Sequence, residues 1–465
     1  MTGWRIEEIL AATGGRLIRE GTHRRFGEVV TDSSKAKRGS VFVALKGVRL
    51  DGHRFVGDAV RRGARCVVVH RHFGASALKN ATLVRVDDTL QALGDLAHFR
   101  RKRLGPTVLA ITGSNGKTTT KEMVAAILEN GSFNGRPLRG RVLKTEGNFN
   151  NLVGLPLTLL RLRPTHKVAV LELGTNHPGE IQRLAEIADP DMAMITSVAA
   201  AHLEGLNSLA GVAREKGALY RSVRAGGTIA VNLEDPWVRR LGAKFRGRKV
   251  TYGARGQIRA ESWRLLGAKG MRLSLRVGRQ RVPAGLNHLG RHNIANALGA
   301  AALTYGFGMS LAAIRRGLES VRPFPMRMEI EDWRGIGIIN DAYNANPASM
   351  EAAIQTLAEI ECRGERIAVL GDMFELGKQS RQQHLQLGRR VSEARLDRLY
   401  LLGPHSRQVQ KGARQGGMPA DRIVIGKDHR GIARQLRNCV KKGDWLLFKG
   451  SRGMKMEQIL MELKG

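Results

Sequence analysis

The chain has 465 residues, 42% of them hydrophobic, which is enough for about three domains that each bury a core. It carries 77 Lys and Arg against 41 Asp and Glu, a net charge of +36, yet the basic residues lie in short scattered clusters and only 5% of residues are aromatic, which argues against a specific nucleic-acid partner. The sequence lacks an apolar run of bilayer length, a signal peptide and paired cysteine motifs, so we expect a cytoplasmic protein with no membrane partner.

Residues 1–105 are predicted to form a small α/β domain. A helical start is followed by apolar strands at 40–47, 66–70 and 83–86, and a helix joins the first two. The helical sequence TLQALGDLAHFRRKRLG then ends at Gly105-Pro106. Because this pair breaks regular structure, we place the first domain boundary there.

Residues 106–322 are predicted to form a central domain built on a parallel sheet. Strands are indicated by TVLAIT, KVAVLELG, MAMITSV and TIAVN, with helical sequences between them. Such alternation is typical of a parallel sheet covered by helices. The stretch from about 250 to 290 favours short antiparallel strands, and a helix resumes at GRHNIANALGAAALTYGFG. Two prolines in VRPFPMRM place the second boundary near residue 322.

A phosphate-binding loop is predicted at the start of this central domain. The strand TVLAIT runs into a turn with Gly113 and Gly116, and Lys117 and Thr118 then open an amphipathic helix. Such a turn points backbone N–H groups and the positive end of the helix dipole at an anion. Lys117 can reach the outer phosphates and the Thr118 hydroxyl can ligate Mg²⁺. The usual spacing is not met, because Ile111 stands where the first glycine is expected, and an ordinary turn with a solvated lysine is the alternative.

Residues 323–465 repeat the alternation of strands and helices. Strands are indicated by IGIIND, RIAVLGD, RLYLLG, RIVIG and DWLLFKG, with helices from Ser349 and around 380–395. This block is typical of a Rossmann-like domain. The expected fold class is therefore α/β with three domains: a small N-terminal α/β domain, a central P-loop ATPase domain with a parallel sheet, and a Rossmann-like C-terminal domain.

Three ionisable residues of the central domain are candidates for chemistry. Glu172 ends a buried strand, at the sheet edge that also carries the phosphate loop. His202 follows MAMITSV and arrives at the same edge, as a metal ligand, a general base or a structural histidine. Lys216 lies in a helix, and its spacing indicates only a solvated face.

Several asparagine-rich turns carry a second set of candidates. Asn148, Asn150 and Asn151 precede an apolar helix, where they could cap it or bind a polar substrate. The segment 290–296 begins a helix with donors suited to capping or to holding a nucleotide base. A strand end in the third block leads into a polar turn that stops at Pro347 and contains Asp341, Tyr343, Asn344 and Asn346.

Motifs along essentially the whole chain resemble the Mur ligase family, ATP-dependent enzymes that form amide bonds and include the folylpolyglutamate synthases. The segments, in order, are TDSSKAKRGSVFVALKGVRLDGHRF, TGSNGKTTT, EGNFNNLVGLP, LELGTNHPGEI, AHLEGL, GRHNIANALGAAA, INDAYNANPASM, AVLGDMFELG and LFKGSRGMKME. YNANP and GDMFELG resemble the branch of the family that adds a dipeptide. The Asp-Asn-Pro-Arg signature of the branch that adds the third residue does not occur, and neither does the DGAHNP signature of folylpolyglutamate synthases.

The resemblance implies roles for residues near ATP. The loop Gly113, Ser114, Asn115, Gly116, Lys117, Thr118 and Thr119 would hold the phosphates. Thr118, Glu172 and His202 would ligate Mg²⁺. Lys216 resembles the family lysine that is carbamylated, a change that turns a cation into a carboxylate able to hold a second Mg²⁺. Asn293 and Asn296 resemble adenine contacts, and Arg327 resembles an arginine that reaches ATP from the interdomain joint.

Further residues resemble the parts of the family that bind the other substrates. Asp341 with Tyr343, Asn344 and Asn346 resembles the ribose and dipeptide side of the C-terminal domain. Asn148 and Asn151 fall in a motif near the phosphates, where they would contact substrate. Ser33, Lys46 and Asp51 lie in the segment that resembles the uridine-diphosphate pocket.

The activity implied by the resemblance is the ATP-dependent joining of D-alanyl-D-alanine to UDP-N-acetylmuramoyl-tripeptide through an acyl phosphate, by a monomer that uses ATP and two Mg²⁺. Both meso-diaminopimelate and lysine remain open as the third residue of the tripeptide. Two alternatives stand beside this expectation: another Mur-type amide ligase with a different muramyl-peptide or folylpolyglutamate acceptor, and a basic P-loop ATPase stimulated by nucleic acid.

Overall fold

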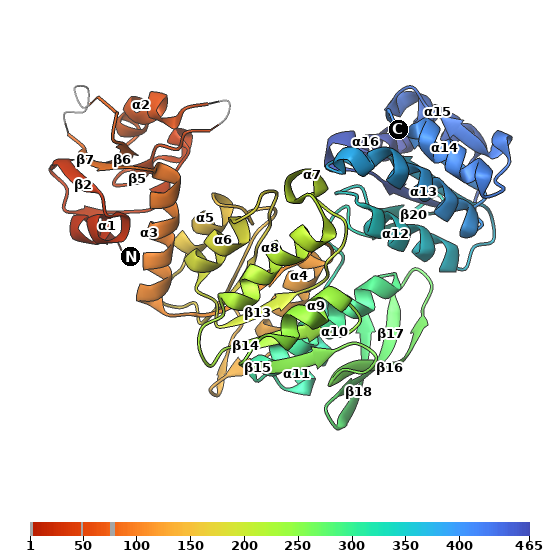
Figure 1. Ribbon diagram of the computed structural model, residues 1–465, viewed down its shortest axis with the longest axis horizontal. Helices are drawn as coiled ribbons and strands as arrows, with labels where there is room; N and C mark the ends of the chain where they lie inside the picture. The colour runs from red at the N-terminus through yellow and green to blue at the C-terminus, as the bar shows by residue number, and fades with distance from the viewer. Residues whose placement is uncertain (1–2, 48–49, 75–79) are drawn as a thin grey trace.

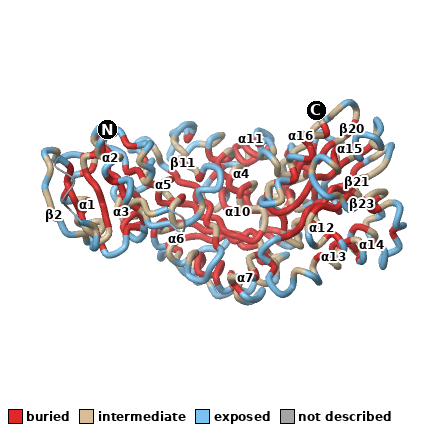
Figure 2. Tube along the Cα trace, turned by 90° about the horizontal axis from the view of Figure 1, so that it is seen from above, coloured by how far each residue is buried: buried red, intermediate tan, exposed pale blue. Residues whose placement is uncertain are grey.

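Three lobes follow one another along the molecule (Figure 1). The computed structural model describes residues 3–47, 50–74 and 80–465. The N-terminal lobe and the C-terminal lobe lie at opposite ends, with the central lobe between them, and buried stretches run through all three lobes (Figure 2). Within the described residues, no helix combines the length and the apolar character needed to cross a membrane.

The N-terminal lobe contains a sheet with strand order β2-β7-β6-β5-β4. Successive residues of a strand face opposite sides, so Val41 and Val43 of β5 pack with the helices α1 and α3, whereas Phe42 packs with α2. The elements are β1 (Trp4–Arg5), α1 (Ile6–Thr13), β2 (Arg16–Arg19), β3 (Arg25–Phe26), β4 (Val29–Val30), η1 (Ser33–Lys35), β5 (Val41–Val43), η2 (Gly52–Phe55), α2 (Val56–Arg61), β6 (Cys66–His70), β7 (Thr82–Val86) and α3 (Thr89–Leu104).

Helix α3 leads out of this lobe. Asp88 caps its first turn by accepting hydrogen bonds from the N–H groups of Leu90 and Gln91. Gly105 ends the helix in a left-handed conformation with φ of +60°, and Pro106 cannot continue it. The break predicted at Gly105-Pro106 is therefore present.

The central lobe is built on a sheet with strand order β11-β12-β8-β13-β14-β15-β16-β17-β18. Strands from β11 to β16 pair in parallel, and β16, β17 and β18 pair antiparallel, as the sequence predicts. The elements are β8 (Thr107–Thr112), α4 (Lys117–Glu129), β9 (Ser132–Phe133), β10 (Arg136–Pro137), β11 (Val142–Lys144), α5 (Gly154–Leu160), β12 (Val168–Glu172), α6 (Glu180–Ala188), β13 (Met192–Ile195), α7 (Leu203–Leu206), α8 (Leu209–Arg221), β14 (Thr228–Asn232), α9 (Pro236–Ala243), β15 (Arg248–Tyr252), β16 (Ile258–Leu265), β17 (Met271–Val277), β18 (Gln280–Leu286), α10 (Arg291–Phe307) and α11 (Leu311–Ser320).

Helices cover both faces of the central sheet. On one face α4, α10 and α11 pack on alternate residues of the strands, such as Leu109 and Ile111 of β8. On the other face α5, α6, α8 and α9 pack on the intervening residues, such as Val108 and Ala110. Because both faces are buried, the parallel strands are apolar throughout, and polar side chains gather at the strand ends.

The C-terminal lobe has a sheet with strand order β19-β20-β24-β21-β22-β23, in which only the β19–β20 pair is antiparallel among the described strands. Helices α12, α13 and α14 pack on one face, and α15 and α16 pack on the other. The elements are β19 (Glu329–Trp333), β20 (Ile336–Asn340), α12 (Pro347–Glu359), β21 (Arg366–Gly371), η3 (Gly377–Gln379), α13 (Ser380–Glu393), β22 (Arg398–Leu402), α14 (Ser406–Gln415), η4 (Ala420–Arg422), β23 (Ile423–Ile425), α15 (His429–Cys439), β24 (Trp445–Lys449), η5 (Arg452–Met454) and α16 (Glu457–Lys464).

Candidate functional site

The phosphate loop connects β8 to α4 and needs glycine at two positions. Gly113 has φ of +153° and Gly116 has φ of +78°, in the region that favours glycine. A Cβ atom at Gly113 would collide with the Thr196 hydroxyl, and one at Gly116 would collide with the Asn296 amide oxygen. The backbone conformation and the packing around the loop therefore both require glycine at these two positions.

Residues that follow β13 accept hydrogen bonds from this loop. The N–H of Ser114 donates to the carbonyl of Ser197 at 2.8 Å, and the Ser114 hydroxyl donates to the carbonyl of Ala199 at 3.0 Å. The N–H of Asn115 donates to the Ser197 hydroxyl at 3.2 Å. Helix α4 begins at Lys117, and the backbone N–H groups of its first residues have no acceptors inside the helix. The loop is thus held in a shape that presents a helix N-terminus to an anion.

The side chain of Lys117 folds back onto the loop that precedes it. Its Nζ donates to the carbonyl of Gly113 at 2.7 Å. Burial lowers the pKa of Lys117, the Glu172 carboxylate opposes that shift, and the Arg327 guanidinium adds to it. The alternative of a freely solvated lysine is wrong, because Nζ of Lys117 is hydrogen-bonded to Gly113 and interacts with the charges of Glu172 and Arg327.

Glu172 is the last residue of β12 and pairs with Ile111 of β8, so it lies at the same sheet edge as the phosphate loop, as predicted. Its side chain is 2% exposed. One carboxylate oxygen accepts from the Asn150 amide at 2.8 Å, and the other is buried without a hydrogen-bond partner among the described residues. A buried carboxylate oxygen without a donor fits a divalent cation. Thr118, at the start of α4, is also buried.

Lys216 is on α8 and is only 1% exposed, so the interpretation of a solvated face is wrong. Burial and the nearby Lys117 charge hold the pKa of Lys216 well below its usual range, and Glu215 opposes them. The Glu215 carboxylate itself accepts hydrogen bonds from the N–H groups of Gly179 and Ile181, at 2.8 and 2.7 Å. Burial and the Lys117 charge therefore both favour the neutral amine of Lys216 over its charged form.

His202 connects the central lobe to the C-terminal lobe. It caps the short helix α7 with φ of +55°, and its Nδ1 lies 2.5 Å from a carboxylate oxygen of Glu375. The hydrogen bond from His202 holds the pKa of the Glu375 carboxyl below its usual range. Across the described part of the chain, no three His, Cys, Asp or Glu side chains form a metal site by themselves, so a cation here would also need hydroxyl, phosphate or modified lysine oxygens.

Asn293 and Asn296 lie in the first two turns of α10, and both are buried. The Asn293 amide donates to the carbonyl of Leu289 at 2.7 Å, and the Asn296 amide donates to the Asn293 side chain at 2.9 Å. Thr120 of α4 donates to Asn296 at 3.4 Å. These amides hold the start of α10 against the phosphate loop.

Arg327 lies in the segment between α11 and β19 that joins the last two lobes. Its guanidinium stacks on the Tyr343 ring at 3.9 Å from the ring centre. Its Nε is buried and, among the described residues, has no hydrogen-bond partner. The positive charge of Arg327 contributes to the lowered pKa of Lys117, so the two cations lie near enough to interact.

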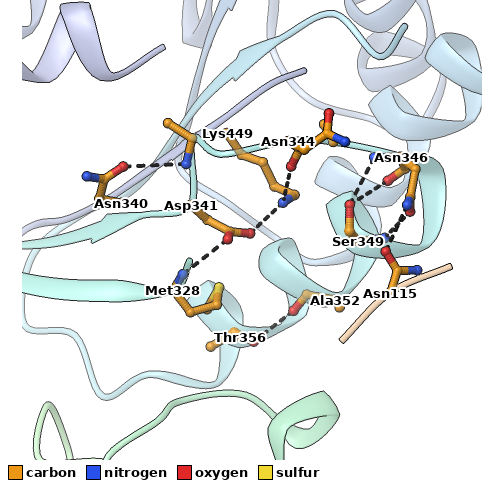
Figure 3. A network of polar contacts seen from close by, with 12 residues as sticks. Asn115, Met328, Asn340, Asp341, Asn344, Asn346, Ser349, Ala352, Thr356 and Lys449 are labelled. Atoms are coloured by element: carbon orange, nitrogen blue, oxygen red, sulfur yellow. Dashed lines mark hydrogen bonds and ion pairs between the residues drawn. The ribbon is translucent and has the colours of Figure 1, made fainter. Parts of the chain in front are cut away.

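A turn of the C-terminal lobe, residues 341–346, contacts the phosphate loop directly (Figure 3). Asp341 accepts from the N–H of Met328 at 3.1 Å and from Nζ of Lys449 at 2.5 Å, and Lys449 also donates to the carbonyl of Asn344 at 3.0 Å. Sequence reasoning missed Lys449, although a lysine that ends an otherwise apolar strand is a recognisable signal.

Asn346 makes the contact to the loop. It caps α12 by accepting from the N–H of Ser349 at 2.9 Å, and its amide donates to the Asn115 side chain at 2.8 Å (Figure 3). The turn that resembles the ribose and dipeptide side of the C-terminal domain therefore contacts the phosphate loop of the central lobe.

The remaining predicted residues lie apart from this centre. Asn148 and Asn151 are exposed, and Asn151 accepts from the N–H of Gly154 at 2.8 Å, whereas their neighbour Asn150 is the one that contacts Glu172.

The predicted uridine-diphosphate residues are in the N-terminal lobe. Ser33 lies in η1, and Asp51 caps η2, where it accepts from the His53 N–H and ring at 3.0 and 2.6 Å. Lys46 pairs with Asp51 in an isolated bridge. Both short helices pack on α2, so the three residues share one region of that lobe.

Three protein-family models match successive parts of the chain. The models described as Mur ligase family, catalytic domain, Mur ligase middle domain, and Mur ligase, glutamate ligase domain match residues 26–101, 111–304 and 326–452.

Curated proteins and solved structures agree with those models. The chain is 37% identical to the UDP-N-acetylmuramoyl-tripeptide--D-alanyl-D-alanine ligase of Escherichia coli, over 94% of this chain and 93% of that protein. It is 35% identical to the protein of the same name from Bacillus subtilis, over 94% and 92%. A crystal structure of MurF from Acinetobacter baumannii superposes with a TM-score of 0.91 at 31% identity, covering 100% of this chain and 99% of that one. MurF ligase from Thermotoga maritima in complex with ADP superposes with a TM-score of 0.83 at 28% identity, covering 94% and 97%.

Proposed function

The chain belongs to the Mur ligase family, and on that premise we propose that it uses ATP to join D-alanyl-D-alanine to UDP-N-acetylmuramoyl-tripeptide. This reaction completes the cytoplasmic precursor of peptidoglycan. One observation carries the proposal: the phosphate loop lies at the same sheet edge as Glu172, whose carboxylate has one unpartnered oxygen, and Asn346 of the C-terminal lobe contacts that loop. Such a convergence can bring a nucleotide, an acceptor carboxylate and an incoming amine together.

Each lobe takes one substrate in this proposal. The N-terminal lobe, residues 1–105, holds the UDP-sugar end through Ser33, Lys46 and Asp51. The central lobe, residues 106–322, binds ATP. The C-terminal lobe, residues 323–465, closes over ATP and receives the dipeptide near Tyr343 and Asn344. A monomer in the cytoplasm, where ATP and UDP-linked precursors occur, suffices for this arrangement.

Thr118, Glu172 and His202 are the residues that would hold Mg²⁺. Glu172 and Thr118 fit the ion, because Glu172 keeps a buried oxygen without a donor and Thr118 lies in the first turn of the helix at the phosphate loop. When bound, Mg²⁺ offsets negative charge on the phosphates and polarises the phosphoryl group. Lys117 adds a positive charge at the same place. The rest of the nucleotide is contacted by four further residues in this proposal: Asn293, Asn296, Arg327 and Asp341.

Lys216 is proposed to be carbamylated. Carbamate formation needs a neutral amine, and burial beside Lys117 favours that form. The product carries a negative charge, which Lys117 would stabilise, and its oxygens could serve a second Mg²⁺. The low pKa and deep burial of this lysine support the assignment.

The reaction proceeds in two steps. The terminal carboxylate of the tripeptide attacks the γ-phosphorus of ATP, which forms an acyl phosphate and releases ADP. The amine of D-alanyl-D-alanine then attacks the acyl carbon, and phosphate leaves. Lys117 offsets the charge of the transferring phosphoryl group, and Arg327 approaches from the joint. The contacts from Asn346 and Glu375 to the central lobe close the site against water, which would hydrolyse the acyl phosphate.

Release of ADP tests the proposed function. We expect turnover only when UDP-muramyl-tripeptide and D-alanyl-D-alanine are both present with ATP and Mg²⁺. Omission of either acceptor should leave only background hydrolysis. Stimulation by DNA or RNA at physiological salt, without stimulation by the peptide substrates, would replace the ligase by a nucleic-acid-dependent ATPase.

A further inference from the structure

The pair His202–Glu375 joins loops of two different lobes. The ring Nδ1 lies 2.5 Å from the carboxylate, and the N–H of Glu204 donates to the carbonyl of Glu375 at 3.2 Å. One contact uses side chains and the other uses backbone, so the position of Glu375 against the central lobe is fixed in two ways.

Both members of the pair have left-handed backbone conformations. The φ angle is +55° at His202 and +61° at Glu375. A residue with a Cβ atom adopts this region at a cost in strain, and such residues persist where the surrounding structure enforces them. Their facing positions indicate that the geometry of this contact is imposed by the fold, which is typical of functional sites.

The loop that carries Glu375 is anchored on both sides. Met373 and Leu376 are buried in the core of the C-terminal lobe. Between them, the N–H of Phe374 donates to the Ser451 hydroxyl at 2.8 Å. The backbone on both sides of Glu375 is therefore held in place, although the Glu375 side chain itself is about half exposed.

The contact also separates the roles of the two ring nitrogens of His202. An ionised carboxylate only accepts hydrogen bonds, so Nδ1 is the donor in this contact. Within the described chain, Nε2 has no hydrogen-bond partner. Metal-binding histidines usually use one ring nitrogen for the metal and direct the other to a carboxylate, backbone carbonyl or water.

We infer that Glu375 is a positioning residue, through which the C-terminal lobe orients His202 toward the cation of the ATP site. The inference rests on the proposed function, in which His202 is a metal ligand. Its consequence is that the cation site is complete only when the C-terminal lobe is docked. Docking of the lobe that receives the dipeptide is thereby coupled to metal binding at the phosphates.

Binding of Mn²⁺ in the presence of ADP, followed by the electron paramagnetic resonance signal of free Mn²⁺, tests this inference on the full chain without turnover. E375A removes the acceptor, E375Q keeps an oxygen that can accept from Nδ1, and E361A removes an exposed carboxylate of the same lobe as a control. We expect E375A to weaken Mn²⁺ binding roughly 10-fold, at the lower end of the range for lost outer contacts of a metal ligand. E375Q should recover most of the affinity, and E361A should match the unchanged protein.

A double variant separates orientation of His202 from other effects. Because both side chains act through one ligand, H202A/E375A should bind Mn²⁺ no more weakly than H202A alone. Weaker binding in H202A with unchanged binding in E375A would overturn the inference and leave the metal role of His202 in place. Unchanged binding in H202A would remove that role and the inference together. If E375A does not fold, as judged by the loss of its thermal transition, the comparison uses E375Q and E375D. Near-normal Mn²⁺ affinity in E375Q together with weaker affinity in E375D would then support the inference, because only E375Q keeps an acceptor oxygen at the distance of the Glu375 carboxylate.

Discussion

Replacement of Lys117 by methionine removes one charge from the phosphate loop and keeps a side chain of similar length. In the protein alone, Nζ donates to the carbonyl of Gly113, and burial and Arg327 both disfavour its charge. The ammonium therefore contributes little to folding. We expect the Tm of Lys117→Met to stay within a few degrees of the unchanged protein, on the scale of about 1 kcal/mol or less.

Catalysis should respond very differently to this replacement. Loss of one donor that stabilises charge in the transition state costs about 3 kcal/mol. Since each factor of ten corresponds to about 1.36 kcal/mol, kcat should fall on the order of 100-fold. ADP release with both acceptor substrates present measures the loss, and Lys244→Met, at an exposed lysine after α9 in the same lobe, is the matched control. Retention of more than about a tenth of kcat, or a large fall in Tm, would refute this reasoning.

Four further predictions concern the same centre and its support. Glu172→Gln should reduce turnover and shift the Mg²⁺ titration to higher concentrations, because an amide replaces the carboxylate that has a free oxygen; an unchanged titration would make Glu172 structural. Lys216→Ala should lose most turnover, and added acetate should restore part of it, whereas near-normal turnover would exclude a carbamate role. Gly116→Ala should lower Tm by several degrees in a thermal melt, since its Cβ would collide with Asn296 at a φ of +78°, and an unchanged Tm would show that the loop relaxes. Burial lowers the pKa of His288 to about 4. The stability that its neutral form contributes is complete above its unfolded pKa near 6.5 and is lost as the pH falls toward 4, by roughly 3 kcal/mol. Denaturant titrations of His288→Gln should show a flatter pH dependence, and an identical dependence would contradict the assignment.

The strand, turn and helix around Gly113 and Gly116 and the sheet-edge position of Glu172 could be predicted because their signals are local. A β-branched strand, two glycines, a lysine and a helix follow one another in a few residues, and their geometry is set by the chain itself. Glu172 ends a second buried strand, and the carboxyl ends of neighbouring parallel strands must meet at one edge. Strand periodicity predicted the sheets of the three lobes for the same reason.

Features that depend on tertiary packing could not be predicted from the sequence. Lys216 and Glu215 are adjacent charged residues on a helix, which indicates a solvated face, but α8 packs so that both are buried at the sheet edge. Asn115 and Asn346 are 231 residues apart, and His202 and Glu375 are 173 apart. Contacts of that range depend on how two lobes dock.

Short elements and repeated residue types set a further limit. The strands β9 and β10 have two residues each, too few for a periodic pattern. Among Asn148, Asn150 and Asn151, only the turn geometry decides that Asn150 reaches Glu172.

Transfer of ¹⁸O tests the central claim most directly. The terminal carboxylate of UDP-muramyl-tripeptide is labelled with ¹⁸O at both oxygens, and the reaction with ATP and D-alanyl-D-alanine is analysed by mass spectrometry. If the carboxylate attacks the γ-phosphorus and the dipeptide amine then displaces phosphate, one ¹⁸O appears in inorganic phosphate and one stays in the amide of the UDP-muramyl-pentapeptide. ADP formed with unlabelled phosphate and without the pentapeptide product would contradict the ligase mechanism.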